Sequence, residues 1–572
     1  MVNRAATMIP KRTLFALWLS AALLAMSTGC ASSGSVQTLE WWNENPPIPE
    51  VDISVSPDGV VPLPLEAHGS LRRVFDLYTK LVAPSGRPIH ILGQRGVDRA
   101  HLVRARELMR FFLTDVPGSR FGSDKAEIAN EMADRWATLV IFKTQEDSYR
   151  EQTGELPLIP LFYQDLYVNQ STLEGTEVYR DNQSRDETLE SVFHLVHGAG
   201  IRFAAPEYHV EIRAAAHAAV RDGLWSTNLD WILDGSTSHQ YVTNVLEVYY
   251  GIWAHDPHGT GRSFGGNYGF IDREGLRDGD PLGIQMLEMF LPASLDFDCE
   301  LPMEFDGSFS MAATEGADYT QKSRYLRRVK LRGSRAVTLR GNELDNLLAG
   351  NAGDNQIEGG GGHDAVTFRG AQAEYEVVVG DDGVEVTDSI AGRDGRDLLT
   401  GVECLHFSDR TLALEGSCEH GFERVLDAPV GDGEPDREWG RFEFDMEAHT
   451  NSIVDELLAC FDTNFDGTLS VTEPPKDIRA LSALSDVDRD GVASRAELVR
   501  ALEAVFAGEV QLTLNPDVEV DRFFDRFDLD RNGRVERGEL PQAMLSGFEE
   551  TDANGDGAIT REELLPSYQE RE

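Results

Sequence analysis

Four twelve-residue windows near the end of the chain repeat the same order of carboxylates, amides and glycine. They are DTNFDGTLSVTE from Asp462 (loop 1), DVDRDGVASRAE from Asp486 (loop 2), DLDRNGRVERGE from Asp528 (loop 3) and DANGDGAITREE from Asp552 (loop 4). Each has an oxygen-bearing side chain at positions 1, 3 and 5, glycine at position 6 and glutamate at position 12. Because Ca²⁺ takes about six to eight oxygen ligands, and a closing glutamate supplies two, the windows predict calcium binding.

The four windows resemble EF-hand loops, in which position 7 contributes a backbone carbonyl and position 9 often acts through water. The resemblance implies that calcium ions are the ligand. It also implies these ligand residues: Asp462, Asn464, Asp466, Thr468, Ser470, Glu473, Asp486, Asp488, Asp490, Val492, Ser494, Glu497, Asp528, Asp530, Asn532, Arg534, Glu536, Glu539, Asp552, Asn554, Asp556, Ala558, Thr560 and Glu563.

The spacing of the loops predicts how they are arranged. Loop starts lie 24 residues apart within each pair, which is similar to closely spaced EF-hands of bacterial exported proteins that share one helix. We expect the residue at position 8 to join the two loops of each pair through a short strand. These residues are Leu469, Ala493, Val535 and Ile559, and the small side chain of Ala493 should make its loop the weaker one in this role. Residues 441–572 contain only two methionines, so a stabilising role is favoured over a sensor that opens a Met-rich groove.

A second region, 341–367, consists of three consecutive nonapeptides, GNELDNLLA, GNAGDNQIE and GGGGHDAVT. The last resembles the repeat of RTX proteins, whose parallel β-rolls hold Ca²⁺ with Asp carboxylates and Gly carbonyls. The resemblance implies Asp364 as a metal ligand and Leu348, Ile357 and Val366 as inward residues, and the residues up to 416 resemble a β cap. A plain Gly-rich loop is the alternative.

The best candidate for other chemistry is the helix expected over 186–197. At 100° per residue, Glu187, Glu190, His194 and His197 share one face, opposite the apolar residues. Imidazoles and carboxylates at this spacing fit a Zn²⁺ or Fe site. A further ligand could come from Glu247, from His239 or from the segment His255-Asp256-Pro257-His258. A solvated polar helix face is the competing interpretation.

This arrangement has a vague resemblance to zincin metallopeptidases, which pair an active-site helix with a downstream Glu. The resemblance implies Glu190, His194, His197 and Glu247 as weak catalytic candidates. The local sequence departs from H-E-x-x-H, because the histidines are three apart and Leu195 follows the first. An exported metal-dependent hydrolase is therefore an alternative; the sequence leaves enzyme activity open and favours a protein that is not an enzyme.

Charge and the N-terminus indicate where the protein acts. Asp and Glu total 98 against 52 Lys and Arg, so the net charge of -46 disfavours nucleic-acid partners. Basic residues followed by an apolar stretch too short for a membrane span predict a signal peptide over 1–29. The following sequence resembles a bacterial lipobox and implies lipidation of Cys30. Cleavage by an ordinary signal peptidase, with release of the protein, is the alternative. We expect an exported protein, lipid-anchored to the outer membrane or cell surface.

The remaining cysteines are Cys299, Cys404, Cys418 and Cys460. Their spacing forms neither a dense disulfide framework nor a C-x-x-C metal pair. One disulfide between Cys404 and Cys418 and isolated buried thiols are both consistent with the sequence.

We therefore predict a multidomain α+β protein. Its parts are a signal peptide (1–29), a tether (30–64), a globular α/β-helical domain (65–325), a short parallel β-roll with β cap (330–416), a linker (417–440) and an all-α EF-hand domain (441–572). In the globular domain, strands are expected at 88–92 and 137–142 and helices at 97–113, 125–136, 186–197, 209–221 and 237–254. The predicted function is calcium binding with a stabilising role, and a calcium-dependent adhesin is a further alternative.

Overall fold

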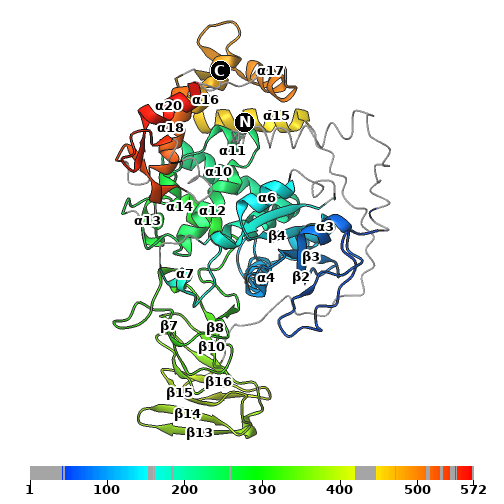
Figure 1. Ribbon diagram of the computed structural model, residues 1–572, viewed down its shortest axis with the longest axis vertical. Coiled ribbons are helices and arrows are strands. Elements are labelled where there is room, and N and C mark those ends of the chain that lie inside the picture. Colours follow the sequence, from blue (N-terminus) through cyan, green and yellow to red (C-terminus); the bar gives the residue numbers. More distant parts are fainter. Residues whose placement is uncertain are drawn as a thin grey trace, which may run out of the picture.

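The computed structural model describes residues 42, 45–152, 159, 161–181, 186–256, 259–418, 446–470, 472–510, 516–528, 532–540, 548 and 551–569. The predicted signal peptide, Cys30, most of the predicted linker, Pro257, His258 and Asp530 lie outside these residues. The protein is mixed α/β with several separate sheets. Figure 1 shows a narrow all-β part at one end of the long axis and a helical part at the other. Within the described residues, no helix is long and apolar enough to cross a membrane.

A five-stranded sheet forms the centre of the N-proximal region, in the order β1-β2-β3-β4-β5. Its strands are β1 (Val61–Pro62), β2 (Phe75–Val82), β3 (Pro88–Gln94), β4 (Thr138–Phe142) and β5 (Tyr163–Tyr167). The first three are antiparallel and the last three parallel. Along β4, alternate residues face opposite sides: Leu139 and Ile141 join one core, while Val140 and Phe142 join another. The strands predicted from the sequence at 88–92 and 137–142 are confirmed.

The second half of the predicted tether lies against this sheet. Ile48, Val51, Val61 and Leu63 are buried in the same core as Val140. They alternate with prolines and acidic residues, so composition suggests a loose segment. Together with Leu71 and Val74 they nevertheless form a packed core on one face of the sheet, and Val61 belongs to strand β1 itself.

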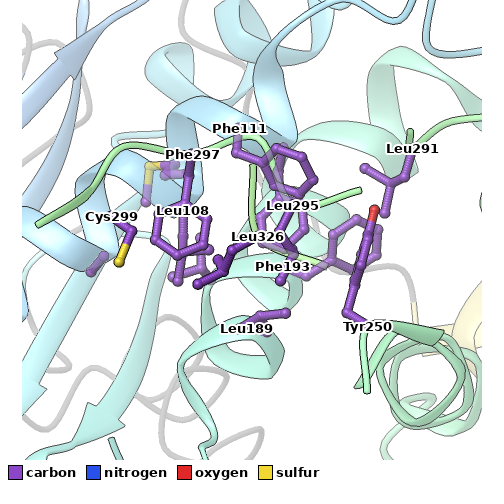
Figure 2. Close-up of a cluster of buried hydrophobic side chains, with 14 of the residues drawn as sticks. Leu108, Phe111, Leu189, Phe193, Tyr250, Leu291, Leu295, Phe297, Cys299 and Leu326 are labelled. Carbon is purple, nitrogen blue, oxygen red and sulfur yellow. The ribbon is translucent and has the colours of Figure 1, made fainter. Parts of the chain in front are cut away.

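Helices form the rest of the N-proximal region. Figure 2 shows α4 (Arg99–Leu113) and α8 (Thr188–Val196) meeting through Leu108, Phe111, Leu189 and Phe193. The other elements are α3 (Gly69–Val74), α5 (Ala126–Asp134), α6 (Gln145–Gln152), η2 (Val168–Gln170), α7 (Glu177–Arg180), the π-helix η3 (His197–Ile201), α9 (Arg202–Ala204), α10 (Pro206–Arg221), α11 (Leu229–Leu233), α12 (Thr237–Tyr249), η4 (Phe264–Gly266), α13 (Arg273–Gly279) and α14 (Pro281–Glu288). The helix expected to reach residue 254 ends at Tyr249, because Gly251 at φ +77° turns the chain.

The all-β part is a coil of short strands that alternate between two sheets (Figure 1). One sheet has the order β17-β16-β12-β10-β8-β6 and the other β13-β14-β15-β11-β9-β7. The strands are β6 (Cys299–Glu300), β7 (Gly307–Ser310), β8 (Arg328–Lys330), β9 (Val337–Arg340), β10 (Leu347–Ala349), β11 (Gln356–Glu358), β12 (Ala365–Thr367), β13 (Tyr375–Gly380), β14 (Gly383–Asp388), β15 (Arg396–Thr400), β16 (Cys404–His406) and β17 (Thr411–Ala413), with η5 (Gln321–Ser323) and η6 (Gln372–Glu374) between them. Neighbouring strands from β6 to β12 are parallel.

Apolar side chains fill the space between the two sheets. Leu348, Ile357 and Val366 are all fully buried, with Ile357 on the sheet opposite the other two. The coil begins at β6, about thirty residues before the sequence predicts, because its first turns lack the Gly-Asp repeat. A disulfide joins Cys404 of β16 to Cys418, whereas Cys299 and Cys460 are buried free thiols.

The C-terminal region has helices on both sides of loops 1 and 2, while α18 precedes loop 3 and α20 follows loop 4. Its elements are α15 (Met446–Phe461), β18 (Thr468–Ser470), α16 (Lys476–Ser485), β19 (Val492–Ser494), α17 (Arg495–Phe506), α18 (Pro516–Phe527), β20 (Arg534–Glu536), η7 (Arg537–Glu539), β21 (Ala558–Thr560) and α20 (Arg561–Gln569). The single helix α16 follows loop 1 and precedes loop 2, as the 24-residue spacing predicts.

Candidate metal centres

The four acidic loops share one set of internal hydrogen bonds. In each, Oδ2 of the aspartate at position 1 accepts the N–H of the position 6 glycine at 2.8–3.1 Å. Oδ1 of the same aspartate accepts the N–H of position 5 at 2.9–3.2 Å. Oε2 of the position 12 glutamate accepts the N–H of position 9 at 2.7–2.9 Å. The repeated sequence of the four loops therefore produces the same closed turn in each of them.

Glycine at position 6 is required by the backbone of these loops. Gly467, Gly491, Gly533 and Gly557 have φ between +81° and +93°. Such angles cost a side chain conformational strain that glycine avoids. In loop 2 the turn brings carboxylate oxygens of Asp486, Asp488 and Glu497 within 4.8 Å of one another. Oxygens gathered this closely are suited to a shared hard cation.

Position 8 pairs the loops, as predicted. Leu469 lies opposite Ala493 in the β18–β19 ladder, and Val535 lies opposite Ile559 in the β20–β21 ladder. Three of these side chains are fully buried and Ile559 is 2% exposed. The two loops of each pair are thus held in fixed register.

One ion pair distinguishes the second pair of loops. Arg534, at position 7 of loop 3, contacts the carboxylate of Asp556, at position 5 of loop 4, at 2.8 Å. This contact lowers the pKa of Asp556. The corresponding residues of loops 1 and 2 are Thr468 and Val492, which carry no charge.

The β-roll contains a buried carboxylate at the residue predicted from its nonapeptide. Oδ1 of Asp364 accepts the N–H of Asn346 at 2.8 Å, whereas Oδ2 is buried and accepts no hydrogen bond from the described residues. A Cβ at Gly359 would lie 1.8 Å from the carbonyl oxygen of Gly401 and 2.6 Å from Asp364 Oδ2. These two oxygens therefore approach the same small space, and burial raises the pKa of Asp364 to about 7.

Asp397 is an equivalent residue on the other sheet, and our sequence reasoning missed it. Its Oδ1 accepts the N–H of Asn355 at 2.9 Å, and its buried Oδ2 accepts no hydrogen bond from the described residues. Burial raises its pKa to about 7 as well. The segment 392–400, GRDGRDLLT, has Gly at its first and fourth positions and Asp at its sixth, so the signal was present. The β13–β14 hairpin separates it from the three consecutive repeats.

Four histidines meet between α8, η3, α10 and α12. Nδ1 of His197 lies 3.1 Å from Nδ1 of His239, and Nε2 of His197 lies 3.0 Å from Nδ1 of His209. Nε2 of His194 lies 3.2 Å from the carbonyl oxygen of His239. His197 is fully buried and the other three are half-buried. Sequence reasoning found His194, His197 and His239 but not His209, which comes from a helix with no recognisable motif.

The predicted carboxylate candidates occupy different places. Glu247 is fully buried on α12, where its Oε2 accepts the indole N–H of Trp253 at 2.9 Å. Glu190 is half-buried one turn before His194 on α8. The predicted histidines therefore lie beside His209, whereas Glu247 is hydrogen-bonded to Trp253.

The family model for the EF hand matches residues 453–473, 520–545 and 546–565. The C-terminal region carries EF-hand calcium-binding motifs. Loops 1, 3 and 4 lie within the matched residues, while loop 2 lies outside them. No curated protein matches the chain.

The EF-hand match agrees with the loop geometry, because all four loops, including loop 2, have the same position 1 hydrogen bonds. Loop 2 is also paired through a strand to loop 1, which the family model does match. Its geometry therefore groups it with the other three EF-hand loops.

Proposed function

We propose that the chain is an exported, lipid-anchored calcium-binding protein in which bound calcium stabilises the fold. Calcium binding rests on the EF-hand motifs. The export and anchoring proposals rest on the predicted signal peptide and on Cys30, which we propose is the lipidated residue.

The repeated loop geometry is the observation that supports this function most strongly. We propose that each EF-hand loop binds one Ca²⁺ through the side chains of positions 1, 3, 5, 9 and 12 and the carbonyl of position 7. Backbone N–H groups donate to the position 1 and position 12 carboxylates within the loop. Ca²⁺ binding would exchange some of these hydrogen bonds for coordination without a large change in loop shape.

A stabilising role fits the packing better than a sensing role. The helices of the first loop pair bury Leu457, Leu469, Leu498 and Leu502 completely in one shared core. Sensor EF-hands instead open on calcium binding to expose an adaptable, often Met-rich, groove. With this core already closed and few methionines nearby, bound calcium would add native stability by mass action.

We further propose that the β-roll binds calcium through Asp364 and Asp397, as its RTX-like sequence suggests. Each has one buried oxygen that lacks a hydrogen bond from the described residues. A buried carboxylate of this kind is costly unless it is protonated or paired with a cation. Ca²⁺ would supply that partner, and the carbonyl oxygen of Gly401 is positioned as a second ligand for an ion at Asp364.

Counting bound ions tests both sets of sites. Wild type should retain one Ca²⁺ for each loop and one each for Asp364 and Asp397 after equilibrium dialysis and elemental analysis. Asp→Ala at positions 462, 486, 528 and 552 together should remove the loop ions, whereas Asp364→Asn with Asp397→Asn should remove only the roll ions. Equal calcium content in wild type and the four-loop variant would contradict the proposed loop sites.

Fractionation of cells tests the anchor separately. Wild type should partition with membranes and Cys30→Ala should appear in the soluble fraction, because one acyl-modified residue is the proposed attachment. Calcium-dependent clustering of the cells that display the protein would instead favour the adhesin. Hydrolysis that requires a transition metal would favour the hydrolase.

A further inference from the structure

We propose that His194, His197 and His239, with His209 as a hydrogen-bond partner, form a binding site for one divalent transition ion of the Zn²⁺ class. The site is separate from the calcium loops and goes beyond the proposed calcium function. Its centre is the pair of facing Nδ1 atoms on His197 and His239, with His194 on one side and His209 on the other.

The geometry brings ring nitrogens together from three parts of the chain. His194 and His197 come from α8 and η3, His209 from α10 and His239 from α12. The ring centroids of His197 and His239 are 4.1 Å apart, and those of His197 and His209 are 5.1 Å apart. The sequence separations are large, so only the packing of these helices makes the cluster.

The backbone around His197 is shaped for this close approach. Residues 197–201 form a π-helix, a rare element that is frequent at functional sites. A Cβ at Gly198 would lie 3.3 Å from Cε1 of His239, which is tighter than ordinary van der Waals contact. Glycine therefore gives the His239 ring room beside His197.

The chemistry of the cluster favours a borderline metal over calcium or an anion. The donor atoms that face one another are ring nitrogens, since Nδ1 of His197 lies 3.1 Å from Nδ1 of His239 and Nε2 of His197 lies 3.0 Å from Nδ1 of His209. Neutral imidazole suits Zn²⁺, Cu²⁺, Fe²⁺ and Ni²⁺, whereas Ca²⁺ selects oxygen ligands.

One ion would be bound by Nδ1 of His197 and Nδ1 of His239. Two ligands at Zn–N distances of about 2.0–2.1 Å in tetrahedral geometry lie about 3.3 Å apart, close to the 3.1 Å between the Nδ1 atoms of His197 and His239. His197 would then donate its Nε2–H to His209, which fixes the ring as outer hydrogen-bond partners of metal ligands do. His194 is close enough to reach the ion by side-chain rotation, since its Nε2 already contacts the His239 backbone.

Cobalt and zinc binding to the full chain tests the site, with calcium saturating the EF-hand loops throughout. Co²⁺ should bind at one equivalent and give visible d–d absorption, and Zn²⁺ should displace it. His239→Asn removes a proposed ligand from a half-buried position, so we expect it to fold and to weaken binding by more than about 100-fold. His209→Asn should weaken binding by about 10- to 100-fold, as loss of an outer hydrogen bond does.

His217→Asn is the matched control. His217 is also a half-buried histidine on α10 whose pKa burial lowers to about 4, but it lies more than two turns from His209. This variant should bind cobalt as wild type does. Absence of d–d absorption in folded wild type would overturn the proposal, and so would equal binding by the His239→Asn and His217→Asn variants when both have wild-type circular dichroism.

Discussion

The two pairs of EF-hand loops have the same internal hydrogen bonds but different surroundings. In the first pair, loops 1 and 2, the core is continuous with the N-proximal helices, because Leu229 and Ile232 of α11 share it with Leu457 and Phe461 of α15. In the second pair, loops 3 and 4, helix α18 touches the N-proximal region at η4, but among the described residues the buried core contains only residues of the pair itself: Val520, Phe523, Phe524, Phe527, Val535, Leu540, Phe548, Ile559 and Leu564. Equal loop chemistry therefore does not imply equal consequences of calcium binding.

Helix α15 connects the first pair of loops to the N-proximal region. Arg221 of α10 donates to the carbonyl oxygen of Ala459, and Glu456 is hydrogen-bonded by the Thr237 side chain at the start of α12. Loop 1 begins at Asp462, immediately after α15 ends at Phe461. Calcium in loop 1 would therefore fix the end of a helix that packs on the N-proximal region, and its binding free energy should stabilise both.

The largest expected effect comes from removing position 1 carboxylates from one pair at a time. The Asp462→Ala, Asp486→Ala variant should lower the calcium-dependent melting temperature of the N-proximal region by roughly 5–10 °C, because saturating ligand contributes about 3 kcal/mol per site. Residues 446–572 contain no tryptophan, and apart from Trp18 and Trp439 every tryptophan lies between residues 41 and 253, so in a Trp439→Phe background the fluorescence change reports the N-proximal region. Trp231 lies on α11, the helix whose Leu229 and Ile232 share the core of the first pair, and its ring stacks on Trp225.

The Asp528→Ala, Asp552→Ala variant is the matched control for this prediction. It should lose the same number of calcium ions and leave the tryptophan melting temperature within about 1–2 °C of wild type. Equal shifts in the two double variants would show that the two pairs are coupled equally to the N-proximal region.

Core truncation should separate the pairs in the same way. Leu457→Ala and Leu564→Ala each remove a buried leucine, from the first and second pair respectively, at a cost of about 2–5 kcal/mol to the free energy of unfolding. Only Leu457→Ala should destabilise the tryptophan-reported transition in urea. A comparable loss in Leu564→Ala would mean that the second pair has contacts with the N-proximal region that matter energetically.

The contact between α15 and α11 should weaken as pH rises. Burial raises the pKa of Asp234, at the end of α11, from 3.8 to about 7, and burial also raises the pKa of Glu456. The folded state therefore favours protonated Asp234. Its contribution to stability is complete below about pH 4 and is lost at up to roughly 1.4 kcal/mol per pH unit as pH rises to 7.

The Asp234→Asn variant isolates this contribution from the histidines, whose lowered pKa values give the opposite pH dependence. Urea unfolding of both proteins in calcium between pH 4 and 8 should show a stability difference that grows with pH in favour of Asp234→Asn. A difference that is constant with pH would contradict a protonated Asp234 in the folded state.

The sequence predicted the parts that depend on local chemistry. Gly467 and its equivalents fix the loop turns, and residues such as Leu469 at position 8 fix the pairing, so both were visible in short windows. Asp397 was also visible in principle, since its own nine residues carry the repeat. His209 was not, because its role depends on how α10 packs against α8 and α12. Ile48 and Val51 were misassigned to a tether for the same reason, because the sheet face that buries them is formed by distant residues.

The smallest expected effect comes from changing Arg534, whose ion pair is a feature of the second pair of loops. Its ion pair with Asp556 is about 40% exposed on both sides, so its contribution to stability should be small. The ion pair competes with calcium for a proposed ligand of loop 4, and Arg534→Gln should therefore raise the calcium affinity of that loop by up to about fivefold. The gain should shrink at high salt, because salt already screens an exposed pair.

Val492→Gln, at the same position of loop 2, is the control, because the apolar side chain there makes no ion pair with loop 1. It should leave calcium affinity unchanged in a titration followed by NMR shifts of the glycine amides at position 6. A fall in loop 4 affinity in Arg534→Gln would mean that the arginine holds Asp556 in place for the ion. The second pair would then depend on a contact between its loops where the first depends on contact with its neighbouring helices.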